Sequence, residues 1–331
     1  MDWKRIFTYS IALICFFAAG CSTLPHEPGE STSKPLAFTT EQRDNLVARF
    51  SPIVNAELST VSYNKIGSVK ADYLDEKEHI FVDSEHPTFY TDQRTFISAL
   101  GNQYTNLIYR IHFEEVPFSI IPFHLTAGNN GGLIFVITLN NDGEPILITT
   151  VHSCGCYLGF TPTSLLPKDA YPEGWDFDEN SVFGENLPPM LTLPSPYTEN
   201  DKILIQLRDA THRVMDIQHI TLQHANAHYS VIEAADQPMS SLKKLRLPDQ
   251  TTTSFYHTEG LRKGYVKDAT KPFELLLMSW WTFDLFVGRD KEFGPREETG
   301  SVFYTSLQPW NRKASDMWEF EKFLTFWGWR L

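Results

Sequence analysis

The sequence predicts an α+β fold in which an antiparallel, β-rich body is closed by C-terminal helices. Short β-branched or aromatic segments, separated by Pro or Gly, fill the middle of the chain. Two pairs of these segments flank turn-forming residues, and beyond one helical signal at the start of the body, helical patterns appear only near the C-terminus. A hydrophobic fraction of 42% and an aromatic fraction of 14% favour a folded globule over a disordered chain.

The N-terminus has the layout of a secretory signal. A short charged segment precedes an almost wholly apolar run, Ile6 to Phe17, and the small residues Ala18, Ala19 and Gly20 follow it. An apolar run of about a dozen residues is too short to span a bilayer, which needs about 20. Residues 1–20 are therefore predicted to be a signal peptide that is removed.

Ala18-Ala19-Gly20-Cys21 resembles the lipobox of bacterial lipoproteins, in which the cysteine thiol receives a diacylglycerol. The resemblance implies lipidation of Cys21 and attachment to a membrane through this N-terminal lipid. Each buried acyl methylene contributes about 0.8 kcal/mol, so several chains would hold the protein stably. Ser22 stands where Asp would signal inner-membrane retention, and this implies an outer-membrane location, on a face that the sequence does not specify.

The segment after Cys21 reads as a tether, because it is rich in Pro, Ser, Thr and Glu and lacks apolar periodicity. We predict a lipidated flexible tether over residues 21–38 and a globular α+β body over 39–331. Thr39 or Thr40 is expected to cap a first helix that runs to about Phe50.

Strand signals dominate the next part of the chain. Ile80–Val82, Thr88–Tyr90, Leu107–Phe113 and Phe118–Leu125 are predicted strands. Since each is short and bounded by turn-forming residues, they favour neighbouring antiparallel strands.

Two hairpins are predicted. One lies between Leu133 and Val151 around Asn140-Asn141-Asp142-Gly143, whose side chains tolerate positive φ. The other joins Lys202–Leu207 to Arg213–Ile220. The Pro-rich stretch between them, about 161–200, is expected to be either a linker that divides the body or a long loop over one core.

Helical patterns return near the C-terminus. Pro272 and Gly288 are placed to begin and end a helix that is apolar almost throughout, and we expect it to be buried on most sides. Asp284 within it should be paired, with Arg262, Arg289 or Lys291 as candidates, or have a shifted ionisation. A last helix is expected to start at Ser315 or Asp316.

The formal charge of −13 disfavours nucleic acid as a partner of the body. The chain also lacks the Walker loop, the Gly-x-Ser-x-Gly elbow and the His-Glu-x-x-His motif, so the common nucleotide, esterase and zinc-protease chemistries are disfavoured. No catalytic residue is assigned, and the sequence does not identify a protein or glycan partner.

Cys154 and Cys156 are the only cysteines beyond Cys21. They follow a predicted strand together with His152, and residues two apart in an extended chain project from one face. A Zn or Cu site with His152, Cys154 and Cys156 as ligands is one interpretation. A structural or redox-active disulfide between the cysteines and a pair of free buried thiols are the alternatives.

His152-Ser153-Cys154-Gly155-Cys156-Tyr157, with Trp280-Trp281 and the aromatic C-terminus, is similar to a group of bacterial envelope proteins to which no activity is assigned. The expected function is a lipid-anchored cell-envelope protein, a non-enzymatic binding or structural module at the outer membrane. The alternative is a periplasm-facing metal-binding or thiol-redox protein that uses His152, Cys154 and Cys156.

Overall fold

The computed structural model describes residues 34–41 and 43–331, and residues 35–331 form one compact unit. The predicted signal peptide, the lipidated Cys21 and most of the predicted tether lie outside the described residues. Those expectations therefore stay predictions.

The strands are β1 (Leu36–Thr40), β2 (Ile53–Ala56), β3 (Ser68–Leu74), β4 (Lys77–Asp83), β5 (Thr88–Ile97), β6 (Gln103–His112), β7 (Glu115–Val116), β8 (Gly128–Asn129), β9 (Gly132–Leu139), β10 (Pro145–His152), β11 (Gly159–Pro162), β12 (Asn180–Val182), β13 (Glu185–Leu187), β14 (Asp201–Leu207), β15 (Val214–Thr221), β16 (Ser230–Pro238), β17 (Leu245–Arg246) and β18 (Thr252–Thr253). The helices are α2 (Leu46–Arg49), α3 (Leu222–His228), α4 (Pro272–Thr282), α5 (Arg296–Thr299) and α6 (Phe320–Phe326).

A ten-stranded sheet in the order β11-β10-β9-β6-β5-β16-β1-β2-β14-β15 organises the body. The hairpin-linked strands pair antiparallel, but β5 with β16, β16 with β1, and β2 with β14 pair parallel. The β-rich body with C-terminal helices is thus confirmed, whereas the sheet is mixed rather than antiparallel.

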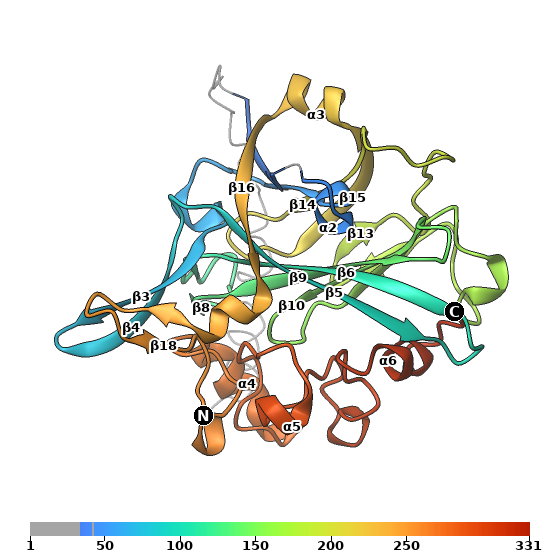
Figure 1. Ribbon diagram of the computed structural model, residues 1–331. Helices are drawn as coiled ribbons and strands as arrows, with labels where there is room; N and C mark the ends of the chain where they lie inside the picture. Colours follow the sequence, from blue (N-terminus) through green and yellow to red (C-terminus); the bar gives the residue numbers. More distant parts are fainter. Residues whose placement is uncertain (1–33, 42) are drawn as a thin grey trace, which may run out of the picture. The chain divides into compact units, whose positions relative to one another are not determined.

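Strand β9 shows why the centre of the sheet is apolar on both faces. Leu133, Phe135 and Ile137 belong to the main core cluster, while Ile134 and Val136 contact the C-terminal region. Helices α4, α5 and α6 lie together on that side of β5, β6, β9 and β10 (Figure 1). Since neither face of β9 meets solvent, its sequence is a continuous apolar run rather than an alternating one.

Both predicted hairpins are confirmed. β9 pairs antiparallel with β10 across the Asn140–Gly143 turn, where Gly143 has φ +75°, and β14 pairs antiparallel with β15. Strands β4, β5 and β6 also match the predicted segments. The prediction for Phe118–Leu125 is wrong, because this segment is a loop whose only pairing is the isolated bridge between Ile120 and Phe123.

The Pro-rich stretch is a long loop over one core rather than a linker. It contains the β12–β13 hairpin, and Leu187, Leu191 and Leu193 are buried in the main core cluster. Since these side chains pack with those of the large sheet, the stretch does not divide the body.

The start of the body differs from the prediction. Leu36–Phe38, placed in the tether by the sequence, belong to β1, which runs parallel to β16 with Leu36 opposite Ser230. A strand therefore occupies the first part of the expected helix, and only Leu46–Arg49 is helical. Pairing with a strand almost two hundred residues away outweighs the local helical signal.

Asn45 caps the short helix α2, since its Oδ1 accepts a hydrogen bond from the Ala48 backbone N–H at 2.8 Å. Asn45→Ala is expected to lower the free energy of unfolding by about 1 kcal/mol, because this N–H loses its partner. Urea unfolding of both proteins, followed by circular dichroism, measures the difference; an unchanged midpoint would argue against the cap.

Candidate functional site

Cys154 and Cys156 lie in a tight loop directly after β10. The His152 backbone N–H donates to the Cys156 carbonyl at 2.9 Å, and the Gly155 N–H donates to the His152 carbonyl at 2.7 Å. The chain is thus folded back rather than extended, contrary to the expectation of three side chains along one strand face. Both cysteines are free thiols, Cys154 buried and Cys156 half-buried.

His152 does not join the two thiols in a ligand set. Its ring centroid lies 4.8 Å from that of Tyr157, and burial together with the charge of Lys271 lowers its pKa to about 3. Across residues 34–41 and 43–331, no group of three or more His, Cys, Asp or Glu side chains is arranged to hold a metal ion. The Zn or Cu site expected from His152, Cys154 and Cys156 is therefore not assembled in this structure.

Buried charges surround the cysteine loop instead. Lys271 Nζ lies 2.9 Å from Asp290 Oδ2, and the Ser153 hydroxyl donates to the other oxygen of this carboxylate. Lys291 Nζ donates to the Cys154 carbonyl and lies 4.0 Å from the centroid of the Tyr304 ring. Two lysines that are almost completely excluded from water therefore flank Cys154.

The two thiols influence each other. The hydrogen bond from Cys156 and the charges of Lys271 and Lys291 lower the pKa of Cys154, although its burial opposes the change. The same hydrogen bond, together with burial, raises the pKa of Cys156. The arrangement favours negative charge on Cys154 and a proton on Cys156.

Glu274, on the first turn of α4, is the least satisfied acid of the site. It is 1% exposed, and its Oε2 has no hydrogen-bond partner. Burial, followed by the charge of Cys154, raises the pKa of this carboxyl to about 8. The side chain packs so closely against Gly288 that a Cβ there would overlap it. Gly288 thus accommodates Glu274 and is not the end of the helix.

Asp284 is paired, but not with the residues that the sequence suggested. The Tyr304 hydroxyl donates to Asp284 Oδ2, and Arg312 lies 3.6 Å from the same oxygen. Sequence reasoning also missed the pairing of Lys271 with Asp290. The sequence signal for this pair was the position of Lys271 and Asp290 beside a strongly apolar segment.

Helix α4 differs most from its prediction. It ends at Thr282 and is followed by Phe283 in the left-handed conformation. Six large apolar side chains from 276 to 285 are exposed instead of buried: Leu276, Leu277, Trp280, Trp281, Phe283 and Leu285. Trp280 is 73% exposed, so burial on most sides is wrong.

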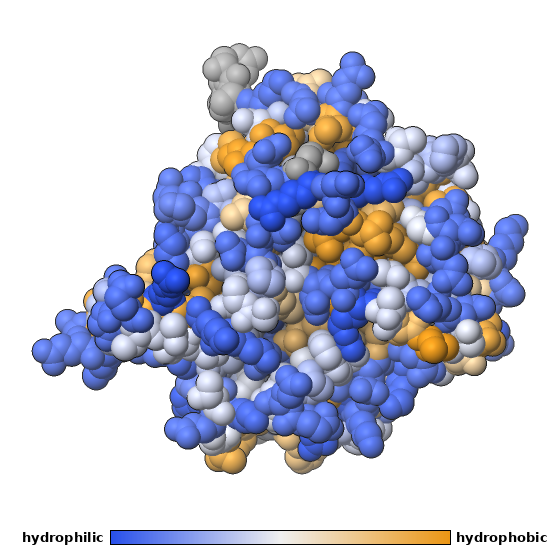
Figure 2. Space-filling model, in the orientation of Figure 1, coloured by the Kyte–Doolittle hydropathy of each residue, from blue (hydrophilic) through white to orange (hydrophobic). Residues whose placement is uncertain are grey.

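The loop 117–126 extends this apolar surface. Phe118, Ile120, Ile121 and Phe123 are exposed, Ile121 to 91%. Phe118 and Phe123 contact Phe273 of α4, with ring centroids 5.4 and 5.3 Å apart. We call the ten exposed side chains of this loop and of 276–285 the apolar face. On the side of the body shown in Figure 2, by contrast, hydrophilic residues predominate.

Arginine side chains border the apolar face. Arg289 lies over the Phe286 ring at 5.9 Å, and Arg312 donates to the Thr282 carbonyl at 2.6 Å. Burial, followed by the charge of Arg262, lowers the pKa of Arg289. Arg312 is already paired with Asp284, so this border carries the charges of Arg262 and Arg289 beside that ion pair.

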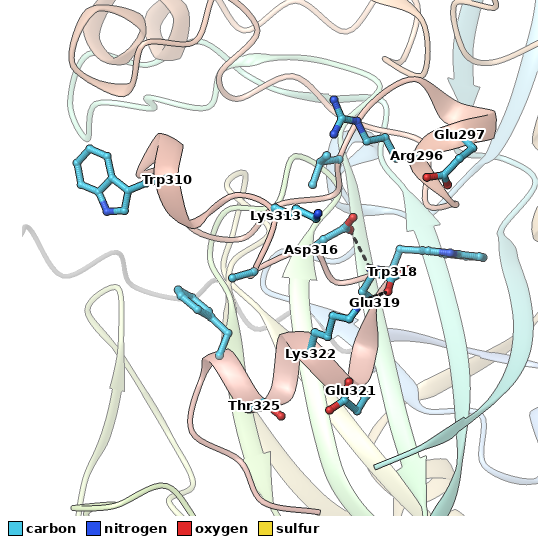
Figure 3. A pocket seen from close by; sticks show the side chains of 13 residues that line it. Arg296, Glu297, Trp310, Lys313, Asp316, Trp318, Glu319, Glu321, Lys322 and Thr325 are labelled. Atoms are coloured by element: carbon cyan, nitrogen blue, oxygen red, sulfur yellow. Dashed lines mark hydrogen bonds and ion pairs between the residues drawn. The ribbon is translucent and has the colours of Figure 1, made fainter. Parts of the chain in front are cut away.

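A separate hollow of about 810 Å³ lies between α5 and α6 (Figure 3). Trp310 and Trp318 border it, together with residues of both charges. Three of these charged residues have local partners: Asp316 accepts from the Trp318 N–H at 3.1 Å, and Lys322 lies 2.8 Å from Glu319. The cysteine loop and the apolar face are therefore the stronger candidate sites.

No protein-family model, curated protein or solved structure matches the chain. In the described part of the chain, no helix has the length and apolar character needed to cross a membrane.

Proposed function

We propose that this protein is a lipid-anchored cell-envelope module that rests its apolar face on a bilayer surface. The observation that carries the proposal is the exposure of ten large apolar side chains on α4 and the neighbouring loop. Apolar surface of this extent on a folded body marks an interaction site. In this proposal, the lipid on Cys21 that the lipobox-like sequence implies attaches the body to a membrane.

The composition of the face favours lipid as its occupant. Trp280 and Trp281 combine a large apolar ring with a polar N–H, which suits the boundary between headgroups and acyl chains. Arg262 and Arg289 border the same surface, where they can contact anionic headgroups at about 1 kcal/mol each. A face of this chemistry fits a bilayer leaflet that contains anionic phospholipid.

The length of chain before the body permits this contact. Leu36 lies beside Ser230 and α3, whereas α4 lies at the opposite end of the body (Figure 1). A body of about 300 residues is about 50 Å across. Residues 21–35 can span about 50 Å when fully extended. One chain can thus hold its lipid and its apolar face on the same membrane, but with little length to spare.

Vesicle flotation of the Cys21→Ser protein, which carries no lipid, tests the face directly. We expect binding to vesicles of phosphatidylglycerol and phosphatidylethanolamine, and weaker binding to pure phosphatidylcholine. Adding Ile121→Ser and Trp280→Ser should weaken binding at least tenfold, because each buried large apolar side chain contributes about 1.5–3 kcal/mol. Since both side chains are exposed, the unfolding midpoint should change little.

Leu100→Ser is the matched control, because Leu100 is 68% exposed but lies on the β5–β6 turn, outside the apolar face. Equal weakening by this control, or no vesicle binding by the parent protein, would refute the lipid contact. A dimer that forms without lipid and is abolished by the paired substitutions would assign the face to a second copy. Separately, recovery of the unaltered chain in the soluble fraction with an unmodified Cys21 would refute the anchor.

A further inference from the structure

The backbone of the cysteine loop brings Cys154 and Cys156 close together. The Cys156 backbone N–H donates a hydrogen bond to Cys154 Sγ at 3.4 Å. Gly155 lies between them with φ +92°, a conformation that favours glycine. The bend brings the two residues nearer than an extended chain would, so that a disulfide requires only a local rearrangement.

Access to the two sulfurs is unequal. Cys154 is 1% exposed, whereas Cys156 as a whole residue is half-buried. A thiolate from another molecule therefore reaches Cys156 first. In thiol–disulfide exchange, the sulfur that is attacked forms the mixed disulfide and the other sulfur leaves as a thiolate.

The surroundings of Cys154 are suited to a leaving thiolate. Lys271 and Lys291 are nearly inaccessible to solvent, and the buried Arg110 donates to the Lys291 carbonyl at 2.9 Å. Asp290 neutralises one of these cations through its ion pair with Lys271. Asp284 is paired with Arg312 and Tyr304. Glu274 also lies near Cys154, but burial raises the pKa of its carboxyl to about 8, so that it is largely uncharged at neutral pH. A negative charge on Cys154 therefore lies among buried cations in excess.

We propose that Cys154 and Cys156 form a redox-active pair that oxidises a dithiol substrate, with Cys156 as the sulfur attacked and Cys154 as the sulfur released. The first substrate thiolate bonds to Cys156 Sγ, which breaks the Cys154–Cys156 bond and leaves Cys154 as a thiolate. The second substrate thiolate attacks the first substrate sulfur and releases Cys156, which takes a proton from water. The substrate loses two electrons and becomes a disulfide, and the protein pair gains those electrons. This activity is independent of the apolar face.

A glutathione redox series on the full chain tests the pair. The chain is equilibrated at fixed ratios of reduced to oxidised glutathione, quenched with an alkylating reagent and analysed by mass spectrometry. We expect one two-electron transition in which Cys154 and Cys156 become protected together. When reduced glutathione attacks the oxidised chain and the reaction is quenched early by alkylation, the mixed disulfide should be found on Cys156 at least ten times more often than on Cys154.

Lys291→Met tests whether a buried cation stabilises the thiolate of Cys154. Loss of this cation should make the reduced state less favourable and change the equilibrium constant with glutathione about tenfold, which corresponds to about 30 mV for a two-electron couple. Lys202→Met is the matched control, because Lys202 is also buried and donates to a backbone carbonyl, that of Arg49 at 2.7 Å, but lies on β14 away from the cysteines. We expect it to change stability without moving the redox equilibrium.

Three results would overturn the proposal. The pair could stay reduced throughout the glutathione series, the mixed disulfide could form preferentially on Cys154, or the purified chain could carry a metal that blocks alkylation of both thiols. The first two results are measured on chains in which Lys271 and Lys291 are intact. They therefore test the redox pair even if Lys291→Met does not fold.

Discussion

Gly155→Ala is expected to destabilise the body by about 4 kcal/mol. The φ of +92° costs a non-glycine residue about 1–2 kcal/mol. In addition, a Cβ at this position would overlap the backbone carbonyl oxygen of Tyr304, which is not a flexible side chain that can move away. Forcing the two backbones apart adds at least about 2 kcal/mol. Urea unfolding monitored by tryptophan fluorescence measures the loss.

Gly143→Ala separates the two causes. Gly143 also has a positive φ, +75°, but no atom lies within 4 Å of an added Cβ in the open turn of the β9–β10 hairpin. The control should cost only about 1–2 kcal/mol, the price of the backbone conformation. If the two variants lose the same stability, the close approach of Tyr304 to the cysteine loop is not present in the folded protein.

The hairpins were predictable because their signals are local. The Asn140–Gly143 turn and the flanking apolar strands lie within twenty residues of each other, and the structure pairs them as expected. The parallel neighbours β16, β1 and β2 were not predictable in this way. Their pairing joins segments far apart in the chain, and nothing in the local sequence of Leu36–Thr40 identifies Ser230–Ala234 as its partner.

Helix α4 shows the limit of apolarity as a guide to burial. Its composition predicted a helix, and the structure has one, but the same composition was taken to mean that it is buried. Composition reports how much apolar surface a helix carries, whereas burial depends on what else packs there. Because Trp280 and Leu276 are exposed, the assumption that an apolar helix is buried gave a wrong prediction. Their exposure in the structure instead marks a candidate interface.

The cysteine loop was located correctly from sequence, but its chemistry was not. The extended geometry that predicted convergence of His152 with the thiols fails, because the chain folds back after β10. The lysines that flank Cys154 come from positions 271 and 291, more than a hundred residues away. Sequence reasoning concentrated on Asp284, whereas Glu274 in the same apolar segment is the more deeply buried and less satisfied acid.

Glu274→Gln is expected to make the stability of the body less sensitive to pH. The carboxyl has an ordinary pKa of 4.5 and titrates near 8 in the folded protein, because burial and the charge of Cys154 disfavour its ionised form. Between these values the unfolded chain has lost the proton and the folded chain retains it. Rising pH therefore favours unfolding by about 1.4 kcal/mol per pH unit, from about 4.5 up to about 8, and the cost stays constant above that.

At pH 7 this cost reaches about 3 kcal/mol in the unaltered protein and is absent from Glu274→Gln. Urea unfolding at several values from pH 4.5 to 8.5 should give curves that converge at the acid end and separate steadily towards pH 8. Glu76→Gln, at an exposed turn position, should stay parallel to the parent throughout. Parallel curves for Glu274→Gln as well would show that Glu274 is solvated. Since the charge of Cys154 contributes to the shift, Cys154→Ser should end the decline at a lower pH, which links this carboxyl to the state of the thiol beside it.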